Sequence, residues 1–311
     1  MVMGFVKSLT AAGVLALSGV AAQAADLAPP PAPPLPPPVE FAGNWYIRGD
    51  VGVASYSTSQ WTQPITGLGN QDQLLSSGFI SRSIQEPAFV DAGLGYQFNQ
   101  WFRADVTAEY RTSIGLRGVF QEKVFNPFVP FAFLGQNEYP GTLQSTLVMA
   151  NAYADIGTWY GLTPYIGAGI GLVRHNMSGF TDSGISWNGG AFNSNGTPDG
   201  ALTGVAFSRI DDKTKTNLAW AVMAGLSYSV TPNLKLDLGY RYMNLGDVPS
   251  GAIHCICGGP TFPGFKVKNL TSNEFRIGMR WMFGEVAEAV PPPVYAPAPE
   301  YVPQQPIVRK Y

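Results

Sequence analysis

The sequence predicts an all-β protein: an eight-stranded antiparallel transmembrane up-and-down β-barrel with four long extracellular loops and proline-rich termini. Three observations support this prediction. Eight segments alternate apolar with polar or small residues at a period of two, which places the two sets on opposite faces of a strand. The connections between these segments are alternately long and short, and residues 1–24 have the composition of a secretory signal peptide.

The N-terminal residues 1–24 combine a positive charge, an apolar run and small residues. Lys7 precedes the apolar run 9–20, and an Ala-x-Ala sequence ends at Ala24. The run is too short to cross a bilayer as a helix. Removing this segment leaves 18 of the 19 Lys and Arg residues against 21 acidic residues, a formal charge of −3. We therefore expect an exported chain that lacks the basic surface needed to bind nucleic acid.

Two proline-rich segments, 25–43 and 284–311, flank the barrel that we predict over 44–283. Between Pro29 and Pro38 the chain is almost continuous proline. Such sequences form extended polyproline spacers, and docking of a proline-recognising module is the alternative interpretation. An even number of strands returns the chain to the side it left. We therefore expect both segments in the periplasm, where they would reach peptidoglycan or a periplasmic partner.

The first three predicted strands cover 44–56, 88–98 and 101–112. A long polar segment separates the first two strands, whereas only Asn99 and Gln100 separate the second from the third. Alternation is clearest in the third strand, where Phe102, Ala104, Val106, Ala108 and Tyr110 alternate with Arg103, Asp105, Thr107, Glu109 and Arg111. Each strand therefore has one apolar face and one polar face.

The fourth and fifth predicted strands, 144–156 and 163–174, follow a second long loop and are joined by a short turn. In the fifth strand, Ile166, Ala168, Ile170 and Leu172 alternate with Gly167, Gly169 and Gly171. These glycines repeat every two residues and no helix follows them, so they do not match a nucleotide-binding fingerprint. We expect the glycines to make room inside a narrow barrel.

The sixth and seventh predicted strands form a hairpin over 215–247 that turns at Thr231-Pro232-Asn233. In its second arm Leu234, Leu236, Leu238, Tyr240 and Tyr242 share one face, and Lys235, Asp237 and Arg241 share the other. Each arm has the roughly 9–11 residues that a tilted strand needs to cross a bilayer. The longest loop, 175–216, precedes this hairpin, and a fourth long loop leads to the last strand, 273–283.

The alternating connections put the four long loops at one end of an antiparallel barrel and the short turns and both termini at the other. This layout is typical of outer-membrane barrels. A soluble lipocalin-like barrel would show the same alternation with its apolar face turned inward. The signal peptide, the loop asymmetry and the aromatic residues near the strand ends favour the membrane barrel.

Four segments resemble the outer-membrane β-barrel family of α-proteobacterial surface antigens and opacity-like proteins, which includes small porins. They are NWYIRGDVG at 44–52, TPYIGAGIGLV at 163–173, the hairpin 217–247 with its LAW, TPN, LDLGYRY and LGD sequences, and EFRIGMRWMF at 274–283. The resemblance spans 44–283 and implies an eight-stranded outer-membrane barrel. Members of this family are described as structural envelope proteins, small porins, surface antigens or hemin-binding proteins.

The resemblance also implies a barrel-insertion signal, because such barrels typically end on an aromatic residue that the insertion machinery reads. Trp281 and Phe283 occupy this place, yet 28 residues follow Phe283, so the signal would be internal. The partners that we expect are therefore the barrel-insertion machinery, outer-membrane lipid and lipopolysaccharide.

Fourteen charged residues fall on the face predicted to line the lumen. They are the cations Arg48, Arg103, Arg111, Lys235, Arg241, Arg276 and Arg280, and the anions Asp50, Asp91, Asp105, Glu109, Asp155, Asp237 and Glu274. They could form an ion-selective pore or a core of salt bridges. Equal numbers favour the salt-bridged core, because eight strands leave an interior just wide enough for side chains and unpaired buried charge is costly.

No catalytic constellation is visible in the sequence, so we expect no enzyme activity, no cofactor and no metal site. Both histidines, His175 and His254, fall in predicted loops. In an exported protein, Cys255 and Cys257 favour a loop disulfide, and a metal or heme contact that includes His254 is the alternative.

The sequence therefore predicts an outer-membrane protein with a structural or surface-exposed role, in envelope integrity, as a surface antigen, or in adhesion through its loops. The alternatives are a narrow porin for small solutes and the binding of hemin or another ligand by the extracellular loops.

Overall fold

The computed structural model describes residues 44–284 except 67, 130 and 257. The predicted signal peptide and both proline-rich segments lie outside the described residues, apart from Gly284. In the described part of the chain, no helix has the length and hydropathy to cross a membrane. All of the regular structure described below is β-strand.

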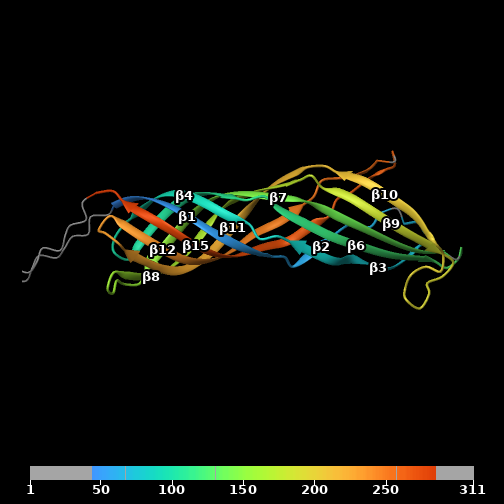
Figure 1. Cartoon of the computed structure of the whole chain (residues 1–311), viewed down its shortest axis with the longest axis horizontal. Coiled ribbons are helices and arrows are strands. Elements are labelled where there is room, and N and C mark those ends of the chain that lie inside the picture. Colours follow the sequence, from blue (N-terminus) through green and yellow to red (C-terminus); the bar gives the residue numbers. More distant parts are fainter. Residues whose placement is uncertain (1–43, 67, 130, 257, 285–311) are drawn as a thin grey trace, which may run out of the picture. The chain divides into compact units, whose positions relative to one another are not determined.

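Eight strands form a closed antiparallel barrel (Figure 1). They are β1 (Asn44–Ser57), β4 (Ala88–Gln97), β5 (Phe102–Arg111), β7 (Phe131–Asp155), β8 (Leu162–Ser178), β11 (Lys213–Ser229), β12 (Leu234–Pro249) and β15 (Lys266–Met282). Each strand pairs with the next one in this order, and β15 pairs with β1, where Asp50 lies opposite Gly278. The eight-stranded barrel predicted from the sequence is confirmed.

The two faces of the barrel wall differ sharply in polarity. Apolar side chains such as Val51, Val106 and Leu238 are exposed on the outside, whereas Arg103 and Arg241 are completely buried inside. A soluble barrel would have the opposite arrangement, because apolar residues would then fill its interior. The outer wall of this barrel instead carries the apolar surface that lipid requires.

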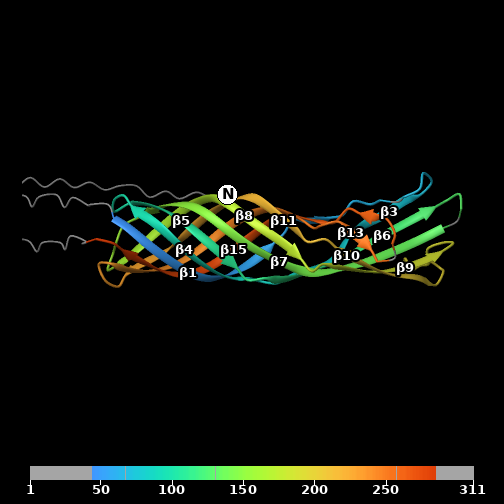
Figure 2. The ribbon, with the colours of Figure 1, turned by 90° about the horizontal axis from the view of Figure 1, so that it is seen from above.

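Three short turns lie at the end of the barrel where β1 begins and β15 ends (Figure 2). They join β4 to β5, β7 to β8 and β11 to β12. Asn233 in the last turn donates hydrogen bonds from Nδ2 to the carbonyl oxygens of Met282 and Gly284, both at 3.0 Å. This end corresponds to the periplasmic side in the layout predicted from the sequence.

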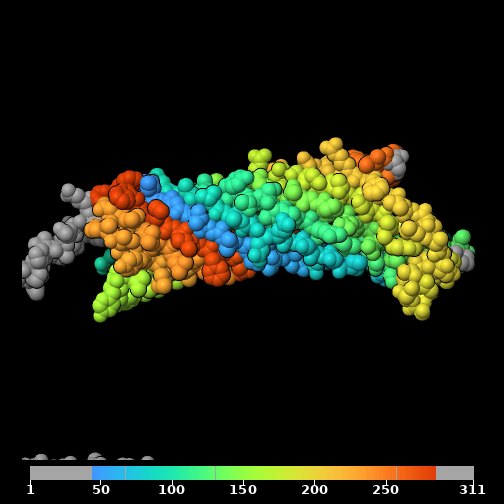
Figure 3. All heavy atoms as spheres, viewed as in Figure 1, coloured from blue at the N-terminus to red at the C-terminus, as the bar shows by residue number. Residues whose placement is uncertain are grey.

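The four long connections contain seven further strands, which the sequence analysis did not predict. They are β2 (Gln60–Thr62), β3 (Gln73–Ile84), β6 (Ile114–Asn126), β9 (Thr181–Gly189), β10 (Leu202–Ile210), β13 (Ile253–Cys255) and β14 (Thr261–Phe262). With the first half of β7 they pair in the order β14-β13-β10-β9-β7-β6-β3, and β2 pairs with β15. We call residues 58–87, 112–143, 177–214 and 246–270 the outer extension; Figure 3 shows its far part, near residue 200, in yellow.

The outer extension has an aromatic core of its own. The ring of Phe265 stacks on Trp61 at 5.7 Å and on Tyr139 at 5.3 Å between centroids, and its edge contacts Phe79 and Phe180. Buried aromatic rings remove large apolar areas from water. The long connections are therefore packed β-structure rather than polar loops, and they can hold a binding surface in a fixed shape.

Candidate functional site

The lumen contains the charged residues that the sequence placed on the inner face. Thirteen of the fourteen are buried, and Lys235 on β12 is partly buried. The pairing register of the strands brings these side chains together across the barrel interior. Residues that are far apart in sequence therefore contact one another. They form three clusters, which we name outer, middle and inner in order from the outer extension to the short turns.

The outer cluster consists of two arginines and two glutamates in a closed cycle. Arg111 contacts Glu109 at 2.7 Å (Nε to Oε1) and Glu274 at 2.5 Å (Nη2 to Oε1). Arg241 donates to Glu274 at 2.6 Å (Nε to Oε2) and forms a second ion pair with Glu109. Arg241 lies on β12 and Glu109 on β5, so this pair ties non-adjacent strands of the barrel together.

The middle cluster joins two arginines to three aspartates. Arg48 contacts Asp50 at 2.8 Å and Asp105 at 2.9 Å, and Arg276 contacts Asp91 at 2.7 Å and Asp50 at 2.9 Å. Arg48 Nη1 also donates to the hydroxyl of Tyr153 at 2.8 Å. This cluster therefore holds one more acidic group than it has arginines.

The inner cluster has the opposite imbalance. Arg103 contacts Asp155 at 3.1 Å and Arg280 contacts Asp237 at 2.7 Å, whereas Lys235 makes no ion pair with any described residue. The guanidinium of Arg103 also lies 4.0 Å from the ring centroid of Tyr153 and 4.7 Å from that of Tyr165. The lumen has equal numbers of cations and anions, but they are unevenly distributed along it. The middle cluster has one extra anion, and the inner cluster, next to the short turns, has one extra cation.

Glycines make the space that these side chains fill. A Cβ at Gly278 would lie 2.0 Å from Oδ1 of Asp50, and one at Gly95 would lie 2.2 Å from the ring of Tyr46. Tyr46 itself donates to Asp105 Oδ2 at 3.0 Å. The inner face of the barrel is therefore filled by protein side chains at these levels.

One side of the lumen is apolar, which was not predicted from the sequence. Strands β7, β8 and β11 fill it with Leu147, Met149, Val173, Ala221 and Met223, all of them buried. The signal was present, because 146–150 and 219–223 have apolar residues on both faces of the strand. Such a pattern indicates a strand that is buried on one side and in lipid on the other.

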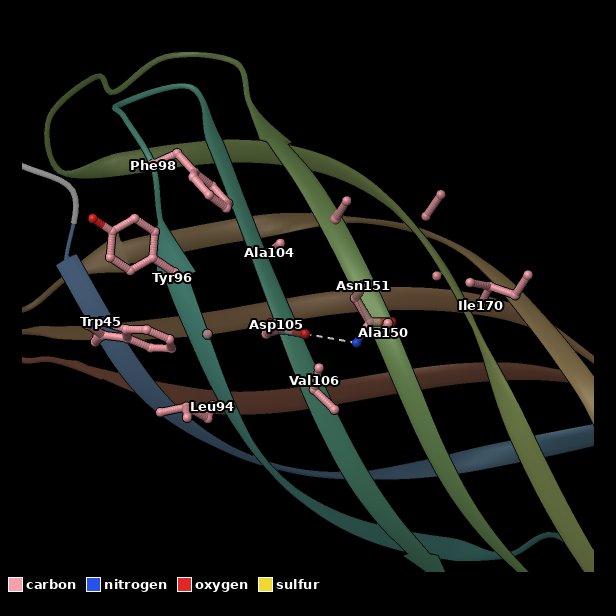
Figure 4. A pocket seen from close by; sticks show the side chains of 14 residues that line it. Trp45, Leu94, Tyr96, Phe98, Ala104, Asp105, Val106, Ala150, Asn151 and Ile170 are labelled. Atoms are coloured by element: carbon pink, nitrogen blue, oxygen red, sulfur yellow. Dashed lines mark hydrogen bonds between the residues drawn. The ribbon is translucent and has the colours of Figure 1, made fainter.

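A shallow groove of about 550 Å³ lies on the lipid-facing wall (Figure 4). Its floor includes Ala104, Ala150, Ala152 and Ala168, and Trp45, Tyr96, Phe98 and Ile170 stand at its edges. Beneath this floor Asn151 donates from Nδ2 to Asp105 Oδ1 at 2.8 Å (Figure 4). Because the side chains of the groove floor are small, only the backbone of the sheet separates lipid from the middle cluster at this point.

The two histidines and the cysteines belong to strands or lie near them, and the prediction that His175 lies in a loop is wrong, because it is a buried residue of β8 close to Arg111. His175 is buried between Ser145 (Nδ1 to Oγ, 2.8 Å) and the carbonyl of Leu245 (3.2 Å from Nε2), and His254 contacts Asp211 at 2.9 Å. Cys255 ends β13 and is disulfide-bonded, whereas Cys257 lies outside the described residues. In the described ranges, no group of three or more His, Cys, Asp or Glu is placed to hold a metal.

The residues of the predicted insertion signal lie where β15 ends. Trp281 and Phe283 are both exposed on the outer wall, and the amide of Phe283 donates to the carbonyl of Trp45 at 2.8 Å. This bond joins the last barrel residue to the first strand. The reading of this segment by the insertion machinery stays a prediction.

Comparison with known proteins places these features in a family. The profile of the outer membrane protein beta-barrel domain matches residues 12–283. An uncharacterised protein of Brucella abortus is 33% identical over 241 residues, which cover 72% of this chain and 76% of the relative. The outer membrane protein PagN of Salmonella typhimurium is 27% identical, with 76% of this chain and 89% of PagN covered.

A third relative, from Rickettsia prowazekii, is named as a candidate adhesin. It is 26% identical over 208 residues, which cover 65% of this chain and 72% of the relative. The fold class, the outer-membrane location and the family resemblance predicted from the sequence are thereby confirmed. The chain belongs to the outer membrane protein beta-barrel domain family.

Proposed function

We propose that this outer-membrane protein is a non-catalytic adhesin, in which the barrel anchors the outer extension that contacts a partner protein. The observation that carries the proposal is an apolar patch on the outer extension, formed by Val205, Phe207 and Ile256. These side chains are 61%, 59% and 75% exposed. We call them the β10 patch.

The β10 patch is held in place by regular structure. Val205 and Phe207 alternate along β10 with Ala206 and Ser208, which line a cavity on the other face. The amide of Ile256 donates to the carbonyl of Phe207 at 3.1 Å, so Ile256 lies beside the strand. Apolar side chains gathered on a water-facing surface mark interaction sites in soluble parts of proteins. A partner with an apolar surface fits this patch.

Two further observations support this function over the alternatives. The ion-paired lumen favours an anchor over the narrow porin for small solutes. The relative named as a candidate adhesin and the surface location favour a role in attachment. Lipopolysaccharide, outer-membrane lipid and the insertion machinery are further proposed partners, and the proline-rich ends would reach peptidoglycan.

The experiment compares attachment of bacteria that express the wild type or the triple variant Val205→Ser, Phe207→Ser, Ile256→Ser. We expect the triple variant to lose most attachment to host cells at equal surface display. Ile80→Ser on β3 is the matched control, because Ile80 is also 59% exposed and lies outside the patch. Heat-modifiable gel mobility verifies that each barrel is folded. Equal attachment by the triple variant would refute the proposal.

A further inference from the structure

We infer that the outer extension contains a binding site for a small organic cation: a protonated amine with an apolar body. The site is a partly open cavity of about 210 Å³ lined by residues of β6, β7, β9, β10, β13 and β14 and of the segment 63–66. Its lining includes Phe120, Glu122, Tyr139, Asp182, Ile253 and Phe262. It lies on the opposite face of β10 from the β10 patch, so this inference is independent of the adhesin proposal.

The charge of the cavity is the first argument. Glu122 on β6 and Asp182 on β9 both line it, and its lining contains no Lys, Arg or His. Asp182 accepts a hydrogen bond from Asn137 Nδ2 at 2.7 Å, whereas Glu122 makes no hydrogen bond or ion pair with a described residue. Burial raises the pKa of both carboxyl groups above their ordinary values. A bound cation would supply the missing counter-charge.

A buried acceptor without a partner is the second argument. The side chain of Gln63 is hydrogen-bonded to Tyr139, but its buried Oε1 has no hydrogen-bond partner among the described residues. Gln63 begins the segment 63–66, which follows β2 and closes one side of the cavity. An unpaired buried acceptor is costly, and an ammonium group offers three donors. An amine nitrogen in the cavity would therefore complete the hydrogen bonding of Gln63 and Glu122.

The apolar part of the lining determines the kind of cation. The rings of Phe120, Tyr139 and Phe262 line the cavity together with Ile65 and Ile253. Aromatic faces attract organic cations and offer contact area to an apolar body, whereas a hydrated metal ion gains little from them. The combination of carboxylates and rings therefore selects an amine that carries an aromatic or branched aliphatic group.

A second hollow adjoins the cavity. It measures about 220 Å³ and is lined by Phe133, Gly135, Gly184 and Gly204, with Asn137 and Ala206 shared with the cavity. The side chains of Phe133, Asn137 and Ser186 occupy the space over the three glycines. The two hollows therefore lie next to each other along β7, β9 and β10.

The test is isothermal titration calorimetry of the full-length refolded protein in detergent micelles at pH 7. The probe is 2-phenylethylammonium, and its neutral and anionic analogues are 2-phenylethanol and 3-phenylpropionate. We expect saturable binding of the cation alone. The double variant Glu122→Gln, Asp182→Asn should weaken it by about tenfold or more, because two charge-assisted contacts are lost.

The matched control is the double variant Glu138→Gln, Asp212→Asn, which removes the same charge from the outer extension outside the cavity. It should bind the probe as the wild type does. Equal binding of 2-phenylethanol, unchanged binding by the cavity variant, or no binding by protein with a folded, heat-modifiable barrel would each overturn the inference. Loss of attachment by the β10 patch variant with intact amine binding would show that the two sites are separate.

Discussion

For single residues, the contribution of a charged side chain to barrel stability depends on its position within the lumen. Arg241 and Lys235 both lie on the inner face of β12, but only Arg241 has ion-pair partners among the described residues, namely Glu109 and Glu274. Removing one member of a buried ion pair leaves an uncompensated charge, which is strongly destabilising. The two positions therefore make a matched comparison.

We expect Arg241→Met to lower the free energy of unfolding by about 3–5 kcal/mol, because Glu109 and Glu274 would then share only Arg111. Lys235→Met should cost less than about 1 kcal/mol, since it relieves the excess positive charge of the inner cluster. Urea unfolding of the refolded protein in lipid vesicles measures both. Similar losses for the two variants would contradict the cluster assignment.

The lipid-facing wall is equally sensitive to charge. Leu238 is 55% exposed on the outer face of β12. We expect Leu238→Arg to cost about 2–4 kcal/mol in vesicles, because the guanidinium would face the centre of the bilayer. Gly239→Arg should also destabilise, since a Cβ there would lie 2.6 Å from the hydroxyl of Tyr165. If Leu238→Arg were as stable as the wild type in the same unfolding measurement, the assignment of the inner and outer faces of the barrel would be wrong.

The pKa of Asp182 predicts a pH dependence in the outer extension. Burial raises this pKa, so ionisation of Asp182 lowers the stability of the extension at neutral pH. Stability is highest below the ordinary carboxyl pKa and is lost as the pH rises through the raised value. Glu122 titrates in the same direction, and Tyr139 stays neutral in this range because burial raises its pKa above its ordinary value.

Asp182→Asn should therefore increase protection of β9 and β10 against hydrogen exchange at pH 7, and the difference from the wild type should shrink toward pH 4. Asparagine keeps an acceptor for Asn137 Nδ2, so the hydrogen bond survives the change. Hydrogen-exchange mass spectrometry, corrected for intrinsic rates, measures the effect. A pH-independent difference between the two proteins would show that charge is not the cause.

At the scale of elements, the outer extension behaves as a packed unit on top of the barrel. Trp61 on β2 stacks on Phe265 and contacts Phe79 on β3, so it links strands that have few other contacts. We expect Trp61→Ala to cost the extension about 3–5 kcal/mol of local stability. Faster hydrogen exchange should be confined to β2, β3 and β6.

The control for this change is Trp45→Ala, which removes an indole from the lipid-facing wall near the short turns. It should leave exchange in the extension unchanged. If Trp61→Ala also abolished heat-modifiable mobility, the result would show that the outer extension and the barrel unfold together.

For the molecule as a whole, the three clusters and the apolar side chains of β7, β8 and β11 occupy the described part of the lumen. We therefore expect purified protein to give no stable single-channel steps in a planar bilayer. Strands of an eight-stranded barrel enclose an interior that side chains can fill, which agrees with this expectation. Reproducible ion-selective steps would instead support the narrow porin.

The eight barrel strands and their faces can be predicted from the local pattern of residues. Lipid excludes charge from the outer wall, so a strand with a polar lumen face separates residues such as Leu238 and Asp237 onto opposite faces, and this shows as a period of two. The same rule places Arg48, Glu109 and Arg241 in the lumen from the sequence alone.

The pairing of the lumen charges and the structure of the long connections depend on how the strands pack together. The pairing of Glu109 with Arg241 joins residues 132 positions apart and depends on the stagger of the strands, which no local pattern encodes. The strands of the outer extension form the predicted extracellular side, where the rule that separates the faces of a spanning strand does not apply, and β3 is exposed along most of its length. The amine cavity takes its lining from six strands, so it exists only once these strands have packed together.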